Sequence, residues 1–79
     1  MEAMKFLKIE LVERQNEFKS AVQVRDTLIE TNPVYIKLAQ NNVDNQMALL
    51  KYCIKICKEV GINTEDAVRI LSGKFDFTY

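Results

Sequence analysis

The sequence predicts an all-α protein organised around a long antiparallel helical hairpin, and three observations support this fold class. The 79 residues include only two glycines and one proline, which leaves little material for loops. The single proline, Pro33, separates two long stretches in which apolar residues recur at spacings of three and four. Hydrophobic residues make up 48% of the chain and charged residues 28%, a composition typical of a single folded domain over residues 1–79.

The first helix is expected over residues 3–30, where the apolar residues follow a heptad pattern. We define its core seam as Met4, Leu7, Leu11, Arg14, Phe18, Ala21, Arg25 and Leu28. The centre, residues 13–17, is polar on all sides but contains no helix-breaking residue, so we expect one continuous helix. A compact three-helix monomer with the first helix broken at this point is the alternative.

The chain is expected to reverse direction at Asn32-Pro33. Pro33 has no backbone N–H and its ring clashes with the preceding turn, so it does not fit inside a continuous helix. Both residues suit a helix start, with Asn32 (or Thr31) as the N-cap and Pro33 at the first helical position. A connection of about two residues makes the two helices antiparallel neighbours. A single helix kinked at Pro33 is the alternative.

The second helix is expected over residues 33–60. Its core seam consists of Ile36, Ala39, Val43, Gln46, Leu50, Cys53, Cys57 and Val60. A tight turn between the helices sets residue 31−k opposite residue 33+k, which places Arg14 near Leu50 and Phe18 near Gln46. The polar centres of the two helices therefore overlap, and a buried Arg or Gln at that level can fix the register. Greater exposure of this region is the alternative explanation.

The second helix is expected to end at Gly61. A glycine adopts the left-handed conformation that commonly terminates helices. Ile62 can then pack back on Cys57, which predicts a Schellman motif at this end.

A short third helix is expected over residues 64–72. Asn63 or Thr64 serves as its N-cap, and two acidic residues follow in its first turn, where the helix dipole favours negative charge. Gly73 ends this helix. The tail, residues 73–79, alternates aromatic and polar side chains as an extended segment does.

The two long helices carry more apolar side chains than one hairpin can bury, because a hairpin has one internal seam. Exposed apolar surface of this kind usually marks an interaction site. The simplest way to cover it is a homodimer or higher oligomer in which hairpins form a helix bundle, although another protein could cover the same surface. The residues expected to form this oligomer or partner interface are Val12, Val22, Val24, Leu38, Leu49 and Ile54.

No catalytic, cofactor or metal site is predicted. Cys53 and Cys57 share one helix face, but two thiols do not complete a tetrahedral zinc site and the chain has no histidine. Their expected role is core packing, and a four-cysteine site across a dimer is the alternative. Because the chain also has no phosphate-binding glycine loop, we expect a protein that is not an enzyme.

A cytoplasmic setting is expected. Two cysteines four residues apart make no disulfide framework, which is typical of a reducing compartment. No apolar run approaches the roughly 18 residues of a membrane span, and the first residues resemble an amphipathic helix rather than a signal peptide. Eleven basic residues balance eleven acidic ones, so no overall field attracts nucleic acid or anionic lipid.

A small helix-turn-helix DNA-binding regulator built on residues 53–72 is the main alternative function. This segment contains a helix, a glycine turn and a second helix. The basic residues available to such a regulator are Lys51, Lys55, Lys58, Arg69 and Lys74. The third helix opens with two carboxylates, which would face the phosphates if it entered the major groove, so DNA binding is possible but not favoured.

The aromatic side chains of the tail have two interpretations. Phe75, Phe77 and Tyr79 either pack on the hairpin of their own chain or form a short segment that binds a partner. The function that the whole sequence favours is a protein-protein interaction or assembly module. It would act as a homo-oligomeric, coiled-coil-like bundle within a small regulatory or structural protein.

Overall fold

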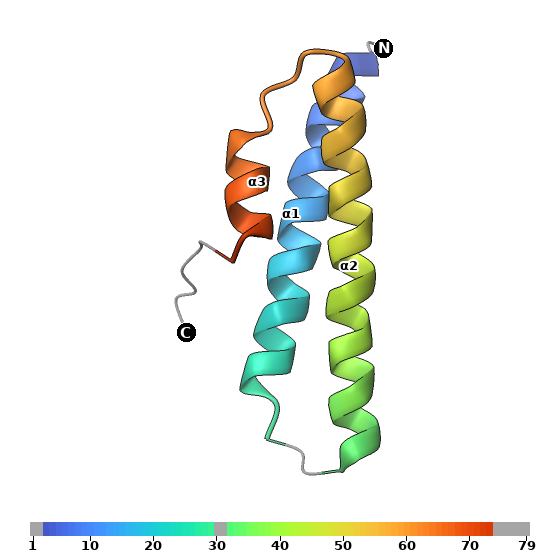
Figure 1. The fold of residues 1–79 in the computed structure, drawn as a ribbon, viewed down its shortest axis with the longest axis vertical. Coiled ribbons are helices and arrows are strands. Elements are labelled where there is room, and N and C mark those ends of the chain that lie inside the picture. Colours follow the sequence, from blue (N-terminus) through green and yellow to red (C-terminus); the bar gives the residue numbers. More distant parts are fainter. Residues whose placement is uncertain (1–2, 30–31, 74–79) are drawn as a thin grey trace.

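The computed structural model describes residues 3–29 and 32–73, and within these ranges the chain forms three helices and no strand. Helix α1 spans Ala3–Thr27, α2 spans Pro33–Glu59 and α3 spans Glu65–Leu71. The two long helices run antiparallel, and α3 lies alongside them near the end that holds the N-terminus (Figure 1). The prediction of an all-α hairpin with a short third helix is confirmed.

Helix α1 ends earlier than predicted, at Thr27 and not at residue 30. The N–H of Leu28 donates to the carbonyl of Arg25, a contact of the 3₁₀ type that tightens the last turn of many helices. The hydroxyl of Thr27 donates to the carbonyl of Gln23 at 2.7 Å. The other helices are each shorter than expected by one residue at one or both ends, since α2 stops at Glu59 and α3 occupies residues 65–71.

Helix α2 begins as its sequence predicts. Asn32 has extended backbone dihedrals, and its side-chain oxygen accepts a hydrogen bond of 2.9 Å from the N–H of Val34. Pro33 occupies the first helical position, where no N–H is required.

A Schellman motif ends α2, again as predicted. Gly61 has a φ of +85°, and its N–H donates to the carbonyl of Lys58 at 3.2 Å. The N–H of Ile62 donates to the carbonyl of Cys57 at 2.9 Å, and both side chains lie in the core. The side chain of Asn63, rather than that of the N-cap Thr64, then accepts a hydrogen bond of 2.9 Å from the N–H of Glu65 at the start of α3.

The core lies where the two predicted seams meet each other and α3. Its buried members are Leu11, Phe18, Ala21, Val22, Val43, Leu50, Cys53, Ile54, Cys57, Ile62, Ala67 and Ile70. Two contacts between the long helices follow the predicted register: the thiol of Cys57 lies 3.9 Å from the carbonyl oxygen of Leu7, and Arg25 contacts Gln40.

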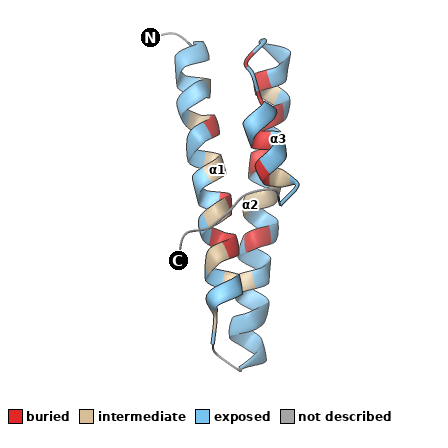
Figure 2. Cartoon of the chain, turned by 90° about the vertical axis from the view of Figure 1, so that its left-hand side faces the viewer, coloured by how far each residue is buried: buried red, intermediate tan, exposed pale blue. Residues whose placement is uncertain are grey.

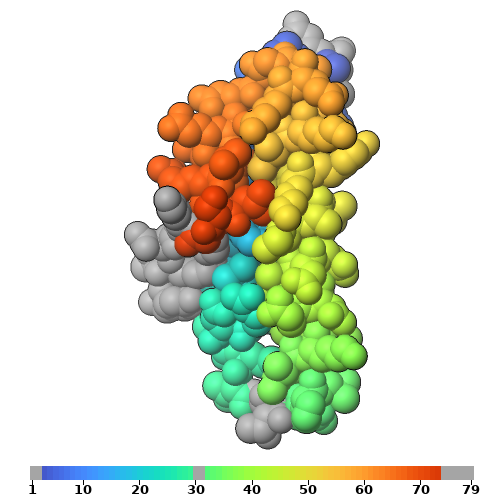
Figure 3. Space-filling view, viewed as in Figure 1, coloured from blue at the N-terminus to red at the C-terminus, as the bar shows by residue number. Residues whose placement is uncertain are grey.

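Helix α3 covers only part of the hairpin. Figure 3 shows α3 over the half that includes the start of α1, whereas the described residues of the half near the turn belong to α1, α2 and their connection. Buried residues follow this division (Figure 2), and none of residues 23–29 and 32–42 is buried. Of the predicted tail, residues 73–79, the structure describes Gly73, and residues 74–79 lie outside the described residues.

Candidate interaction surface

The groove between α1 and α2 has two sides, and α3 occupies one of them. On that side, a cavity lies between α1 and α3. It is lined by Asp66 and Ala67 of α3 and by residues that follow the core seam of α1 by one position, such as Lys8 and Val12. We call this side the front face.

The opposite side of the groove consists of the residues that precede the two core seams by one position, and we call it the rear face. On α1 these residues are Phe6, Glu10, Glu13, Glu17, Ser20 and Val24. On α2 they are Tyr35, Leu38, Asn42, Asn45, Leu49, Tyr52 and Ile56. Because the helices are antiparallel, a step of one residue toward the N-terminus rotates both stripes to the same side of the hairpin.

The rear face is apolar at both ends. Near the N-terminal end of α1, an open cavity of about 300 Å³ is lined by residues of α1 and α2 only, including Phe6, Leu49 and Tyr52. Tyr52 is 65% exposed. Near the turn, Val24 and Leu38 are 53% and 57% exposed. Apolar side chains in two parallel heptad stripes are typical of a helix-packing surface that has no partner within the chain.

The middle stretch of each rear-face stripe is polar, and the two polar stretches lie at different heights along the hairpin. Glu13 and Glu17 of α1 are exposed there, as are Asn42 and Asn45 of α2. No ion pair is found for either glutamate within the described residues.

Two polar side chains also enter the core near the middle of the hairpin. Arg14 Nε is 3.2 Å from an oxygen of Glu10, but this ion pair does not have hydrogen-bond geometry. The side-chain oxygen of Gln46 is buried and accepts no hydrogen bond within the described part of the chain. A buried polar atom without a partner costs free energy, so this level of the hairpin is less stable than an apolar layer.

The structure corrects two of the six predicted interface residues. Val22 and Ile54 are only 8% and 6% exposed, so the chain itself already covers them. Both follow their core seams by one position, which places them on the front face, and Ile54 belongs to the same core cluster as Ala67 and Ile70 of α3. The sequence reveals that two flanks are apolar but not which flank α3 will cover.

The other four predicted interface residues are exposed. Val24, Leu38 and Leu49 belong to the rear face, and Val12 lies at the edge of α3. The prediction omitted four apolar residues of the rear face, namely Phe6, Tyr35, Tyr52 and Ile56. In the sequence, these residues recur at spacings of three and four, each one position before a residue of the core seam.

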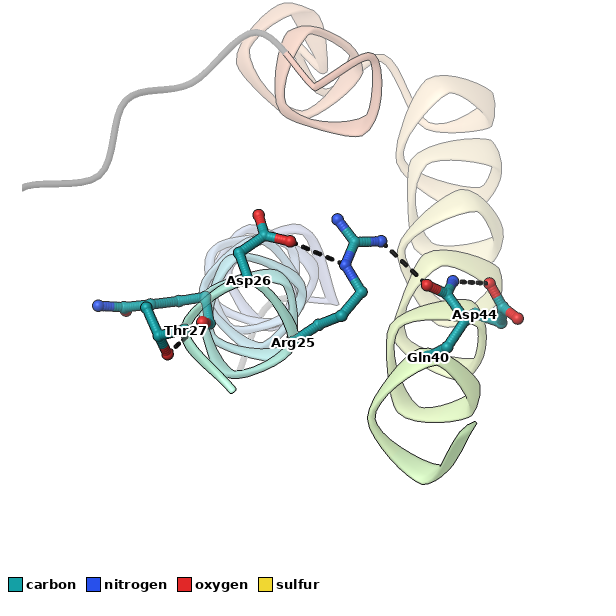
Figure 4. Close-up of polar contacts among 6 residues, drawn as sticks. Arg25, Asp26, Thr27, Gln40 and Asp44 are labelled. Atoms are coloured by element: carbon teal, nitrogen blue, oxygen red, sulfur yellow. Dashed lines mark hydrogen bonds and ion pairs between the residues drawn. The ribbon is translucent and has the colours of Figure 1, made fainter. Parts of the chain in front are cut away.

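A polar network links α1 and α2 near the turn, as Figure 4 shows. The guanidinium of Arg25 donates to the side-chain oxygen of Gln40 at 3.2 Å and pairs with Asp26 at 2.9 Å. The amide of Gln40 donates in turn to Asp44 at 3.0 Å. All these side chains are at least partly exposed, so the network orients the helices more than it stabilises them.

The two cysteines are free and buried in the core. Burial, reinforced by the neighbouring thiol of Cys57, raises the pKa of Cys53 from 9.0 to about 11. Cys53 is therefore a protonated thiol at neutral pH. The described residues contain no group of three or more side chains able to hold a metal ion.

The basic residues of the DNA-binding alternative do not converge on α3. Lys51, Lys55 and Lys58 are exposed along α2, whereas Arg69 pairs with Asp66 within α3 at 3.2 Å. Lys74 lies outside the described residues. Figures 1 and 2 show α3 alongside the long helices, whereas the helices of a helix-turn-helix cross at about 90–120°.

Within residues 3–29 and 32–73, no helix combines the length and apolar character needed to cross a membrane. Comparison with known proteins found no matching family model, curated protein or solved structure.

Proposed function

We propose that this protein is a non-enzymatic assembly module that forms a homo-oligomeric helix bundle through its rear face. The observation that carries the proposal is the pair of exposed heptad stripes on α1 and α2. These stripes place Phe6, Val24, Leu38, Leu49 and Tyr52 on one side of the hairpin, each at least 47% exposed.

The size of the chain supports the same proposal. A domain of about 80 residues buries only about 60% of its unfolded surface, so small domains commonly gain stability by oligomerisation. Among the described residues, fourteen large apolar side chains are exposed and twelve apolar residues are buried. A second copy would bury many of the exposed ones. We place this assembly in the cytoplasm as part of the proposal, in keeping with two free thiols.

Light scattering over a concentration series tests the proposal. We expect the mass of a dimer or higher oligomer for the natural sequence and the mass of a monomer for Leu49→Asp, because a carboxylate would be buried in the interface. Ile9→Asp is the matched control, since Ile9 is similarly exposed, at 52%, but lies on neither stripe. A natural sequence that stays monomeric at high concentration would contradict the proposal.

The DNA-binding alternative predicts a different result. Binding that relies on Lys51, Lys55 and Lys58 weakens steeply with salt, so it should be strongest at low ionic strength. Fluorescence anisotropy with a labelled DNA duplex measures it. We expect no binding at low salt, and salt-dependent binding that Lys55→Glu abolishes would favour the alternative.

A further inference from the structure

A cavity on the front face lies directly beside the last residues of α3. We infer that the aromatic segment of residues 74–79 packs back into this cavity in the same chain, with the ring of Phe75 inside it. The inference concerns the front face, so it goes beyond the proposed assembly through the rear face and is tested separately from it.

The cavity has an apolar lining and a polar edge. It measures about 400 Å³, and its lining includes Ser72 and Gly73 at the end of α3 and the partly exposed Arg25 and Asp26 of α1. Its apolar lining residues are Phe18, Val22, Val43, Met47 and Leu71. The first three belong to the buried core, and the other two pack against it. An apolar cavity of about 150 Å³ is enough to bind benzene, so this one admits a phenylalanine ring.

The chain leaves α3 at the edge of this cavity. Gly73 is one of the lining residues, and its N–H donates to the carbonyl of Ile70 at 2.9 Å. Its φ of +80° is a left-handed conformation, which ends the helix and turns the chain away from the helix axis. Phe75 follows two positions later, and two residues span at most about 7 Å, so its ring is within reach of the cavity.

The sequence after Gly73 suits packing along one side of a groove. Aromatic residues alternate with polar ones over this segment, which consists of Lys74, Phe75, Asp76, Phe77, Thr78 and Tyr79. In an extended segment, successive side chains point to opposite sides. The three aromatic rings would therefore face the hairpin while the three polar side chains face water.

Tethering favours this segment over any other occupant of the cavity. A segment joined to its site by a short linker has an effective concentration on the order of millimolar, whereas a separate partner must bind from dilute solution. The charges also agree, because the segment brings Lys74 and Asp76 to an edge formed by Asp26 and Arg25. None of the described residues that line the cavity belongs to the rear face, so the packed segment leaves the proposed assembly surface uncovered.

Nuclear Overhauser effects measured by NMR test the contact directly in the natural sequence. With the methyl groups of valine and methionine isotopically labelled, we expect contacts from the ring protons of Phe75 to the methyl groups of Val22, Val43 and Met47. The Phe75→Leu variant identifies the ring signals by their loss. A Phe75 ring without contacts to these methyl groups would overturn the inference.

The same measurement on mixed labelled and unlabelled copies shows which chain supplies the ring. An isotope filter retains only contacts between different copies, and we expect it to retain none between Phe75 and the methyl groups of the cavity. Retained contacts would show that the segment packs into a second copy, which overturns the inference and leaves the proposed self-association intact. The mass of the natural sequence in solution tests that self-association independently.

Thermal unfolding provides a second test at a concentration at which light scattering shows a monomer. Phe75→Ala should lower the melting temperature by roughly 10 °C, because a small domain loses one buried ring. Thr78→Ala is the control, since Thr78 belongs to the polar row, and it should change the melting temperature little. Equal melting temperatures for the two variants would contradict a buried Phe75.

A double variant distinguishes direct contact from general destabilisation. The losses for Phe75→Ala and Met47→Ala should be less than additive when combined, because the two side chains touch. Leu7→Ala is the matched control, since Leu7 also packs partly buried against the core but does not line the cavity, so its loss should add to that of Phe75→Ala. Full additivity for Met47 and Phe75 would show that Phe75 packs elsewhere.

Discussion

Around α3, the hairpin packs three helices deep, and side chains such as Leu50 and Ala67 are completely buried. Beyond α3, toward the turn, α1 and α2 are the only helices among the described residues, and none of residues 23–29 and 32–42 is buried. At the turn end the interactions are polar. Asn32 caps α2, Arg25 of α1 donates to Gln40 of α2, and Gln40 donates to Asp44. The same hairpin is therefore held by buried apolar side chains at the α3 end and by polar contacts at the turn end.

The two ends of the hairpin therefore differ both in stability and in the apolar surface that they leave exposed. Buried apolar area is the main source of folding free energy, so the α3 end should resist unfolding while the turn end opens locally. The turn end nevertheless carries large exposed apolar residues, including Tyr35 and Leu38. If the turn end acquires its stability from a second copy, the two ends should respond differently to mutation and to protein concentration.

The largest effect is expected from Leu50→Ala at the α3 end. Leu50 is completely buried, and such a truncation typically costs about 2–5 kcal/mol in the free energy of unfolding. Leu49→Ala is the matched control, since the neighbouring Leu49 is 47% exposed. Urea denaturation at a concentration low enough for a monomer measures both. Equal losses for the two variants would show that the α3 end is not the stable part of the hairpin.

Alkaline pH should destabilise the α3 end through Cys53. The thiol has a pKa of about 11 in the folded chain and 9.0 when unfolded, so between these values the folded state retains a proton that the unfolded state releases. The free energy of unfolding should therefore be unaffected below pH 9 and fall as the pH rises from 9 toward 11, by on the order of 2 kcal/mol at most.

The Cys53→Ala variant isolates this effect, because it removes this thiol and no other ionisable group. Urea midpoints at pH 8, 9 and 10 should decline less steeply for the variant. Identical slopes would show that the thiol titrates normally in the folded state.

At the turn end, Asn32→Ala should cost about 1 kcal/mol, because the N–H of Val34 loses its hydrogen-bond acceptor. Asn32→Asp keeps an acceptor and serves as the control. Hydrogen exchange should show faster exchange at the start of α2 and unchanged protection around Leu50. Faster exchange throughout the chain would mean that the two ends unfold together.

The parts of the fold that depend on local sequence could be predicted. The positions of Asn32, Pro33 and Gly61 determine the start and end of α2, because each satisfies a steric or hydrogen-bonding requirement of a helix terminus. The heptad seams were predictable for a similar reason, since their period of 3.5 residues lies close to the 3.6 residues per turn of an α-helix.

The side of the hairpin taken by α3 was not predictable from local sequence. Val22 and Leu49 are both apolar and flank their seams, yet Val22 is buried and Leu49 is exposed. The difference arises from the path of the chain after Gly61, which carries α3 to the front face. Tertiary packing of this kind has no periodic pattern in the sequence. Only the structure therefore distinguishes the exposed rear face from the buried core.

The smallest effect is expected from Arg25→Ala, which removes the hydrogen bond to Gln40 and the ion pair with Asp26. Both contacts are exposed, so the cost should be about 0.5 kcal/mol or less and should shrink further in high salt. Arg69→Ala is a matched control, since it removes a comparable exposed pair from the α3 end. Thermal unfolding at low and high salt measures both variants. A loss for Arg25→Ala as large as that for Leu50→Ala would mean that the polar network, and not the buried core, holds the hairpin together.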